Sequence, residues 1–410
     1  MKDNKTGIVI LLYNRLFDPL VQSNFWLYID DFLNDTANPY QFHVISYEDD
    51  HYPLTDEQAR LVDRWKTQGL EWTALPWHQG TGMVSKLVDL SAAFRKMLNL
   101  RLRGFSFVVG YGSVSGTMAY LCARPLGMSL FIHTFEPHSE YSRDSGVWSE
   151  NSWGYRALNY FENQMAHFAK VIASGTCFMQ ERLQTEWGVK GKFFKIPSVA
   201  NEQKFLFSKA ERDSTRNALG LTNDQWVMLY SGKFGGLYYK DEMALIFRWL
   251  KEMESRLHLL IVSPQSDIEI HEIFSRVGVP LQDYSVVQSE YHDIHKYYFA
   301  ADFGINILPP SPVQKYRSPI KVGEFLCSGL PFLTNYGVSE DYLIAEEKNV
   351  GAVIQDITTE EIMSAWQKIK AILSVPADKR RAHCREVGIE YRGFTRLNPT
   401  FKNALLYLVR

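Results

Sequence analysis

The sequence predicts an α/β protein built from two doubly wound domains. The chain has 410 residues, which at about 150 residues per domain is enough for two or three domains. Short apolar runs alternate with helical patterns along the chain, and this alternation restarts after a polar segment at residues 198–224. Such alternation is typical of parallel sheets covered by helices. We therefore expect two similar α/β halves in one chain.

In the first half, the expected strands are short runs rich in β-branched and aromatic residues. Several of them are continuously apolar, as strands covered on both faces should be. They are residues 7–13, 42–46, 70–75, 105–109, 130–133, 170–174 and 193–196. Helical patterns between them include residues 24–33, 56–67 and 155–169.

In the second half, the polar segment contains a leading helix, and the same rhythm then returns. The expected strands are residues 226–230, 257–262, 284–287, 303–307, 331–333 and 352–354. We place the boundary near residue 200, with domains at residues 1–200 and 201–390. Open parallel sheets bind ligands at the carboxyl ends of their strands, so we expect the ligand in a cleft between the two halves.

Composition and charge exclude several classes of protein. Hydrophobic residues make up 46% of the chain and charged residues 22%, which excludes low-complexity disorder. The formal net charge of −2 provides no global field for nucleic acid or an acidic membrane. The four cysteines contain no C-x-x-C pair, so neither a zinc knuckle nor a disulfide framework is indicated. No apolar run reaches the roughly 18 residues of a membrane span, and we expect a cytoplasmic protein.

Three nucleotide-binding motifs are absent from the sequence. It contains no G-x-G-x-x-G, no G-x-x-x-x-G-K-[ST] and no D-x-D, which removes most support for dinucleotide, P-loop and metal-clamped nucleotide-sugar sites. A bound diphosphate would then be neutralised by side-chain cations and backbone N–H groups. We expect no metal and no cofactor.

The most informative segment is SPIKVGEFLCSGLP at residues 318–331. Ser318 suits a helix N-cap, with Pro319 and Ile320 in the first turn, and Gly329 suits the helix end. A helix N-terminus of this kind binds anions. Three residues separate Lys321 from Glu324, so both side chains project from one helical face. An isolated S-P-x-K would more often be a capped helix with a surface ion pair, but the whole segment favours the binding interpretation.

As a whole, this segment resembles the donor-site motif of family 4 glycosyltransferases, which are retaining enzymes of the GT-B fold with two Rossmann-like domains. The resemblance implies that Glu324 holds the ribose of a nucleotide sugar and that Ser318 to Lys321 cap its diphosphate. The family's E-x(7)-E motif has an earlier Glu where this chain has Tyr316. Three explanations of this departure stay open. Recognition of the donor sugar is altered, the chain belongs to the S-P-x-K subgroup in which that carboxylate is often absent, or activity is lost.

A second segment, YSGKFGGLYYK at residues 230–240, resembles the family's phosphate loop. The resemblance implies that Lys233 and Lys240 neutralise the diphosphate, and two preplaced cations would stabilise a leaving diphosphate without a metal. Glycines allow close approach of backbone to phosphate; here they are Gly232, Gly235 and Gly236.

The first half contributes FIHTFEPHSEY at residues 131–141. In the resemblance, His133 takes the place of a His beside the donor sugar, with a donor-contact or transition-state role. Glu136, His138 and Glu140 are candidates for the acceptor side, and a hydrogen-bonded loop is an equal interpretation. Their spacing matches no metal-ligand set. The family also implies that the last segment, residues 391–410, returns to the first domain.

The resulting hypothesis is a retaining, metal-independent glycosyltransferase. It would move a sugar from UDP or GDP to a hydroxyl of a glycan, lipid-linked or protein-linked acceptor, in surface polysaccharide, glycoconjugate or glycolipid assembly. Two alternatives stay open: a nucleotide-sugar epimerase of the same fold, and a degenerate scaffold subunit, the latter because of Tyr316. Apolar residues at helical spacing (Phe94, Met97, Leu98, Leu102) among basic ones leave peripheral contact with the inner face of the membrane open as well.

Overall fold

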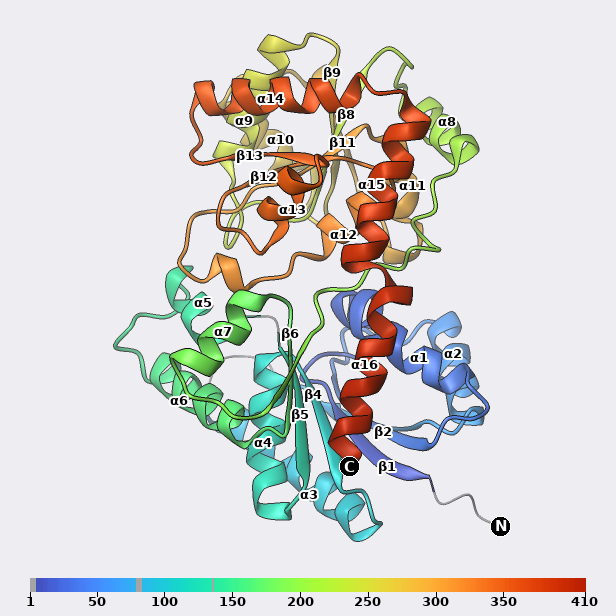
Figure 1. Ribbon diagram of the computed structural model, residues 1–410, viewed down its shortest axis with the longest axis vertical. Helices are drawn as coiled ribbons and strands as arrows, with labels where there is room; N and C mark the ends of the chain where they lie inside the picture. Colours follow the sequence, from blue (N-terminus) through green and yellow to red (C-terminus); the bar gives the residue numbers. More distant parts are fainter. Residues whose placement is uncertain (1–4, 79–82, 135) are drawn as a thin grey trace. The chain divides into compact units, whose positions relative to one another are not determined.

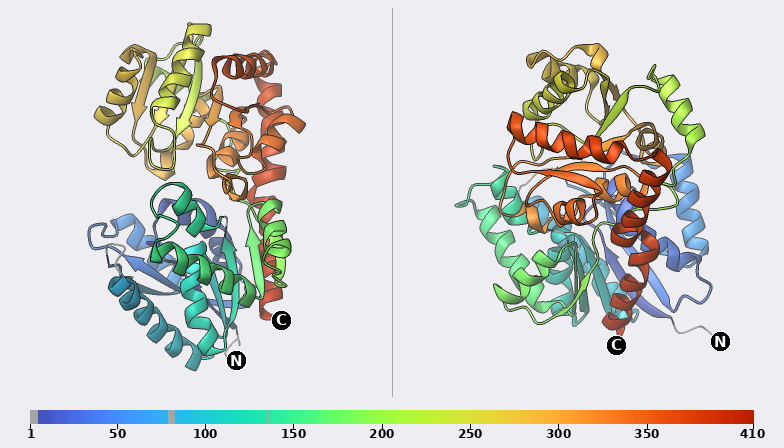
Figure 2. Two further views of the ribbon diagram at one scale, coloured as in Figure 1. Left: turned by 90° about the vertical axis from the view of Figure 1, so that its left-hand side faces the viewer. Right: turned by 45° about the horizontal axis from the view of Figure 1, so that its top comes forward.

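The computed structural model describes residues 5–78, 83–134 and 136–410. The chain divides into two compact units. The first unit comprises Met1–Pro197 with Leu397–Arg410, and the second comprises Ser198–Arg396. Each unit contains one parallel sheet with helices packed against it (Figures 1 and 2).

The first unit holds a seven-stranded sheet in the order β3-β2-β1-β4-β5-β6-β7. The order reverses between β1 and β4, and because crossovers are right-handed, this reversal places helices on both faces. The strands are β1 Thr6–Leu11, β2 Tyr40–Glu48, β3 Glu71–Pro76, β4 Phe107–Tyr111, β5 Ser129–Thr134, β6 Val171–Ser174 and β7 Lys192–Lys195. The helices are η1 Val21–Phe25 (a π-helical turn), α1 Trp26–Asn34, α2 Asp56–Thr67, α3 Met83–Leu102, α4 Ser113–Leu126, α5 His138–Asp144, α6 Trp153–Phe168 and α7 Cys177–Thr185. Helix α16 Phe394–Val409 belongs to this unit from Leu397 onward.

The second unit holds a six-stranded sheet in the order β10-β9-β8-β11-β12-β13, with its reversal between β8 and β11. The strands are β8 Trp226–Ser231, β9 Leu257–Val262, β10 Tyr284–Val287, β11 Phe303–Asn306, β12 Phe332–Asn335 and β13 Gly351–Ile354. The α-helices are α8 Lys209–Ala218, α9 Asp241–Met253, α10 Asp267–Arg276, α11 His295–Ala300, α12 Ile320–Cys327, α13 Asp341–Glu347, α14 Thr359–Leu373 and α15 Ala377–Arg392. Short 3-10 turns lie at Leu281–Asp283, Tyr291–Asp293 and Gln314–Tyr316.

The predicted fold class is confirmed, because every predicted strand range overlaps an observed strand of a parallel sheet. Helix starts were less accurate. The helix expected from residue 24 begins as the π-helical turn Val21–Phe25 before α1, and the final helix begins at Phe394. Helix boundaries depend on local capping, which sequence patterns resolve poorly.

Helix α16 comes from the far end of the sequence and completes the core of the first unit (Figure 1). Phe401 stacks on Tyr28 with ring centroids 4.3 Å apart and meets Phe25 edge-on. On the rim of this contact, Asp31 accepts from Lys402 at 2.6 Å and from Asn398 at 3.0 Å. Aromatic residues make up 14% of the chain, and some of them form this contact between α16 and the rest of the first unit.

The apolar stripe predicted on α3 is not one exposed face. Met97 is fully buried together with Ala93 and Leu100, whereas Leu102 is 80% exposed. Leu98, which also belongs to the stripe, is 40% exposed, so the stripe is divided between the interior and the surface. Across the described ranges, no helix is both long enough and apolar enough to cross a bilayer.

In the second unit, α12 lies flush on the sheet and on α15 because two glycines leave room for it. A Cβ on Gly304 of β11 would lie 2.6 Å from the ring of Phe325, and one on Gly388 of α15 would lie 2.7 Å from the Cβ of Leu326. Any side chain at either position would push α12 away from its neighbours. This packing fixes the helix that carries Lys321 and Glu324.

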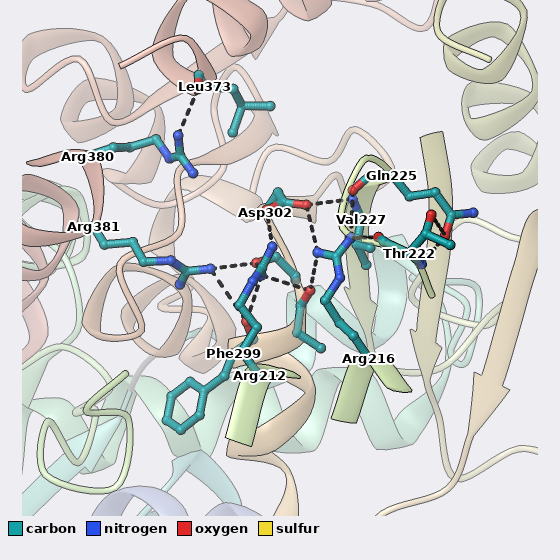
Figure 3. A network of polar contacts seen from close by, with 12 residues as sticks. Arg212, Arg216, Thr222, Gln225, Val227, Phe299, Asp302, Leu373, Arg380 and Arg381 are labelled. Carbon is teal, nitrogen blue, oxygen red and sulfur yellow. Dashed lines mark hydrogen bonds and ion pairs between the residues drawn. The ribbon is translucent and has the colours of Figure 1, made fainter. Parts of the chain in front are cut away.

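A buried carboxylate, Asp302, joins three elements at the start of β11 (Figure 3). Its Oδ1 accepts from Arg212 at 2.7 Å, and its Oδ2 accepts from Arg216 at 3.3 Å and from the backbone N–H of Val227 at 2.9 Å. Because α8 supplies both arginines and Val227 belongs to β8, one side chain ties α8, β8 and β11 together.

The same arginines bind the C-terminal carbonyl groups of α11 (Figure 3). Arg212 and Arg381 each donate to the carbonyl of Ala301 at 2.7 Å, and Arg212 also donates to that of Phe299 at 2.9 Å. Cations at a helix C-terminus offset its partial negative charge. Burial lowers the pKa of Arg381 to about 9, so the carbonyls and Asp302 are needed to keep the cluster charged.

We expect Asp302→Asn to destabilise the second unit by about 3–5 kcal/mol, because removing one partner leaves Arg216 buried without a counter-charge. The free energy of unfolding in urea measures this effect. Asp213→Asn is the matched control on the same helix, where an exposed i,i+4 pair with Lys209 is lost at a cost below about 1 kcal/mol. Equal loss of stability in both variants would contradict the structural role of Asp302.

Candidate active site

The carboxyl edge of the second unit's sheet brings the two glycosyltransferase-like segments together. Strands β8 and β11 are neighbours and run parallel, so the chain leaving β8 at Gly232 lies beside the one that leaves β11 toward α12. The loop after β8 and the side chain of Lys321 approach each other closely, because a Cβ on Gly232 would lie 3.2 Å from Lys321 Nζ. Residues about 90 positions apart in the sequence thus share one site.

The glycine loop after β8 has a backbone that favours glycine. Its φ angles are 148° at Gly232, 79° at Gly235 and 63° at Gly236, which L side chains adopt rarely. Lys233 and Lys240 are both exposed, and within the described ranges neither forms an ion pair with a carboxylate. Two uncompensated ammonium groups therefore flank this loop.

Lys321 is the cation that the protein itself holds in place. Its ammonium group lies 5.2 Å from the ring centroids of both Tyr230 and Tyr238, a cation–π arrangement. Burial lowers the pKa of Lys321 to about 8, and the charge of Arg317 contributes in the same direction. An anionic ligand would therefore find a cation that gains charge when the ligand binds.

Glu324 lies one helical turn further along α12 and is 5% exposed. Burial raises the pKa of its carboxyl group, while the hydroxyl of Tyr298 and the charges of Lys204 and Lys321 act in the opposite direction. Tyr298 donates to Glu324 Oε2 at 2.6 Å. Among the residues that the structure describes, none forms a hydrogen bond with the other carboxylate oxygen, which can therefore bind a ligand.

Two residues near Glu324 were missed as site residues in the sequence analysis. Lys204 donates to the carbonyl of Tyr291 and lies 3.2 Å from the centroid of that ring, and burial lowers its pKa to about 8. From the sequence, Tyr298 is expected to be a core aromatic residue on a helix, and it is buried in α11. No sequence signal connects either residue to Glu324, because each comes from a different segment of the chain.

The structure corrects the predicted start of α12. Pro319, not Ser318, occupies the N-cap, and the helix begins at Ile320. The Ser318 hydroxyl instead accepts from the backbone N–H of Ser198 at 2.9 Å and from Arg392 at 2.7 Å. The Ser318 side chain therefore pairs with distant segments of the chain instead of capping α12. Gly329 does follow the helix end as predicted, with φ of 76°.

Tyr316 ends a short 3-10 turn and is 6% exposed, with Lys315 Nζ 5.1 Å from its ring centroid. The loop it belongs to borders a pocket of about 310 Å³ lined by residues 310–312, 314 and 335–338. This pocket lies at the carboxyl ends of β11 and β12, on the edge where parallel sheets bind ligands.

In the first unit, His133 stands on β5 and is fully buried among aromatic rings. The centroids of Tyr111 and Phe401 lie 5.7 and 6.2 Å from that of His133, and its Nε2 lies 3.3 Å from the carbonyl of Ile196. Burial lowers its pKa to about 4. The imidazole is therefore neutral at pH 7, and its sugar-contact role stays a prediction.

The three acceptor-side candidates lie at the start of α5. The Glu140 carboxylate accepts from Arg182, at 3.0 Å for Nη1, and the backbone N–H of His138 donates to Glu162 at 2.9 Å. The carbonyl of Glu136 accepts from Ser113 at 2.7 Å. All three residues are thus held by contacts within the first unit, and their acceptor role stays a prediction. Within the described part of the chain, no group of His, Cys, Asp or Glu residues has the arrangement of a metal site.

Comparison with known proteins identifies the fold. No family model and no curated protein matches the sequence. Among solved structures, sucrose-phosphate synthase from Thermosynechococcus elongatus superimposes with a TM-score of 0.73 at 13% identity, covering 99% of each chain. WaaG, a glycosyltransferase of lipopolysaccharide biosynthesis, gives 0.68 at 15% identity, covering 98% of this chain and 99% of WaaG. HepE of Anabaena in complex with UDP gives 0.67 at 12% identity, with 98% and 99% covered.

We expect acid to destabilise the first unit through His133. Its unfolded pKa is about 6.5 and its folded pKa about 4, so only the unfolded chain binds a proton between these values. Stability present above pH 6.5 is lost as the pH falls toward 4, by up to about 3 kcal/mol. The difference in unfolding free energy between pH 7 and pH 5 should shrink in His133→Asn, and should stay unchanged in the control His383→Asn, an exposed residue on α15.

These matches over the full length of both chains, at low sequence identity, show that the protein has the GT-B fold.

Proposed function

We propose that the protein is a glycosyltransferase that moves a sugar from a nucleoside-diphosphate sugar to an acceptor hydroxyl. The observation that carries the proposal is the pairing of Lys321, held against the glycine loop, with the buried carboxylate of Glu324 on the same helix. A cation beside flexible backbone suits a diphosphate, and a buried carboxylate suits paired hydroxyls. Solved structures of the same fold contain UDP and UDP-glucose, which supports UDP as the first nucleotide to test, with GDP as the second.

In this proposal, Lys233, Lys240 and Lys321 neutralise the diphosphate, assisted by Gly232, Gly235, Gly236 and the backbone from Ser318 to Ile320. Glu324 holds the ribose hydroxyls, oriented by Tyr298. Charge develops on the leaving diphosphate in the transition state, and the preplaced cations stabilise it there. Retention of configuration and independence from metal follow from the sequence resemblance and belong to the proposal.

The acceptor is proposed to be a glycan or a lipid-linked or protein-linked hydroxyl compound, as in polysaccharide or glycolipid assembly. The scaffold alternative keeps one observation in its favour, since Tyr316 replaces a carboxylate. Isothermal titration calorimetry separates the two ideas. Absence of binding by both UDP and GDP would favour the scaffold, whereas a micromolar site for either nucleotide would count against it.

We expect Glu324→Gln to weaken UDP affinity about 10–100-fold, because a charge-assisted hydrogen bond to the ribose contributes about 1.5–3 kcal/mol. Lys240→Ala should lower turnover more than nucleotide affinity, because its charge matters most for the leaving diphosphate. Calorimetry with UDP and release of UDP from UDP-sugars provide the two measurements. Glu347→Gln, an exposed change on α13, is the control, and site variants that behave like it would refute these assignments.

The affinity for UDP should also depend on pH through Lys321. Its pKa of about 8 in the free protein must rise when a diphosphate binds, because the ligand favours the charged amine. Affinity is therefore complete below pH 8 and falls by up to tenfold per unit above it. Lys321→Arg, which stays charged, should flatten this dependence. An unchanged slope in that variant would exclude Lys321 as the titrating group.

A further inference from the structure

Helix α3 (Figure 1) carries apolar residues on two opposite sides, and the first unit buries only one of them. On the inner side, Ala93, Met97 and Leu100 are fully buried. On the outer side, five apolar residues are between 40% and 80% exposed, and we call them the outer stripe: Val84, Leu87, Val88, Leu98 and Leu102. A surface helix normally has a single apolar side, and a helix that is apolar all round is normally buried. The packing of the unit therefore does not account for the outer stripe.

The residues of the outer stripe lie along one line of the helix. At 3.6 residues per turn, Val84 and Leu102 are five turns apart and project in the same direction, and the other three lie within about 60° of it. The line is about 27 Å long. In its middle, Arg95 Nε donates to the carbonyl of Ser91 at 3.3 Å, and the apolar stem of Arg95 continues the line. Single exposed apolar residues are normal on a protein surface, whereas apolar residues gathered in one place and rimmed by polar ones mark an interaction site.

Positive charge borders the outer stripe. The acid of α3, Asp89, is fully buried and lies 2.6 Å from His78 Nδ1, and the other charged residues of the helix are cations. At about 100° per residue, Arg101 projects to one side of the stripe and Lys96 to the other. In the part of the chain that the structure describes, no carboxylate forms an ion pair with Arg95, Lys96 or Arg101. The stripe is therefore an apolar line with uncompensated positive charge on both sides.

A second copy of this chain fits the outer stripe poorly. A line of about 27 Å and the roughly 10 Å width of a helix give on the order of 300 Å², whereas a stable dimer buries about 800 Å² on each partner. Two stripes in contact would also bring the cations of both copies together, and like charges that face each other across an interface are unfavourable. Size and charge both argue against self-association through this side of α3.

A lipid surface fits the shape and the charge of the stripe. A helix that lies in the bilayer interface places its apolar side at the boundary between headgroups and acyl chains, and its cations beside anionic headgroups. One narrow side of a helix is enough for this contact, because fluid lipids adapt to the shape of the protein. Each cation near an anionic surface adds to the attraction. A long side chain such as Arg95 reaches the headgroups while its stem stays among apolar atoms.

From these observations we propose that the outer stripe of α3 docks the protein on a bilayer that contains anionic phospholipids. The stripe lies at the acyl boundary, and Arg95 and Lys96 contact the phosphate groups. The association is reversible, because one narrow stripe inserts little apolar surface. This inference goes beyond the proposed function, since it involves α3 alone and no nucleotide.

Ile268 on α10 provides a comparison within the same chain. It is 68% exposed, as members of the outer stripe are, but Asp267 and Glu269 flank it. Acidic side chains repel anionic headgroups, so we expect no lipid contact at this position. Ile268→Asn is therefore the matched control for loss of an exposed apolar side chain without a positive border.

Co-sedimentation of the full chain with lipid vesicles tests the proposal. One set of vesicles is phosphatidylcholine alone, and the other contains about one-third phosphatidylglycerol, which is anionic. We expect the wild type to bind the mixed vesicles about tenfold or more tightly than phosphatidylcholine alone. Added salt should weaken this binding, because it screens the attraction between the cations and the headgroups.

Two double variants separate the apolar and the charged contributions. Leu98→Asn with Leu102→Asn removes one apolar end of the stripe, and Arg95→Glu with Lys96→Glu reverses the charge at its border. Each should lower the affinity for mixed vesicles about tenfold or more, whereas Ile268→Asn should bind like the wild type. The substituted residues lie outside the buried side of α3, so circular dichroism and the midpoint of thermal unfolding should stay unchanged.

Three results would overturn the proposal: a wild type that binds neither kind of vesicle, equal binding to both kinds, or double variants that bind like the wild type. A second copy would be the occupant instead if the wild type sediments as a dimer and the variant with Leu98→Asn and Leu102→Asn as a monomer. Failure of the proposed function looks different, because a chain that binds neither UDP nor GDP would leave the vesicle result unaffected.

Discussion

The buried carboxylate of Asp302 is the constraint on which the second unit depends. Its arginine partners also hold the C-terminal carbonyls of α11, and this short helix carries Tyr298. Tyr298 in turn donates to Glu324. A structural ion cluster on one side of the sheet is thus connected, through a single helix, to the carboxylate proposed to hold the ribose. Precise placement of a polar side chain requires such support from the residues behind it.

Charge in the second unit is concentrated at the candidate donor site. This site gathers the ammonium groups of Lys233, Lys240 and Lys321 around a glycine loop, although the whole chain has a formal net charge of only −2. Such an arrangement suits a leaving group that gains negative charge. The net charge of the protein does not reveal it.

Much of the fold was predictable because strands covered on both faces are continuous apolar runs, as at 7–13 and 226–230. The glycine loop and the SPIK segment were predictable because their residues are contiguous. Ser318 was misassigned because its partners, Ser198 and Arg392, come from distant segments and compete with the local cap. Lys204 and Tyr298 were missed for the same reason, since their importance depends on contacts that only the folded chain creates. The structure also shows how deeply His133 is buried, which the motif did not indicate.

Helix α16 also determines the order in which the units can mature during synthesis. The second unit, Ser198–Arg396, is contiguous, whereas the first unit needs Phe401 from the other end of the chain to close its aromatic core. The first half of this sequence is synthesised before α16, and it therefore cannot finish folding until that helix emerges. Until then, the apolar surface around Tyr28 and Phe25 stays uncovered, a state prone to aggregation and suited to chaperone binding. The N-terminal half is thus the later of the two to complete its core.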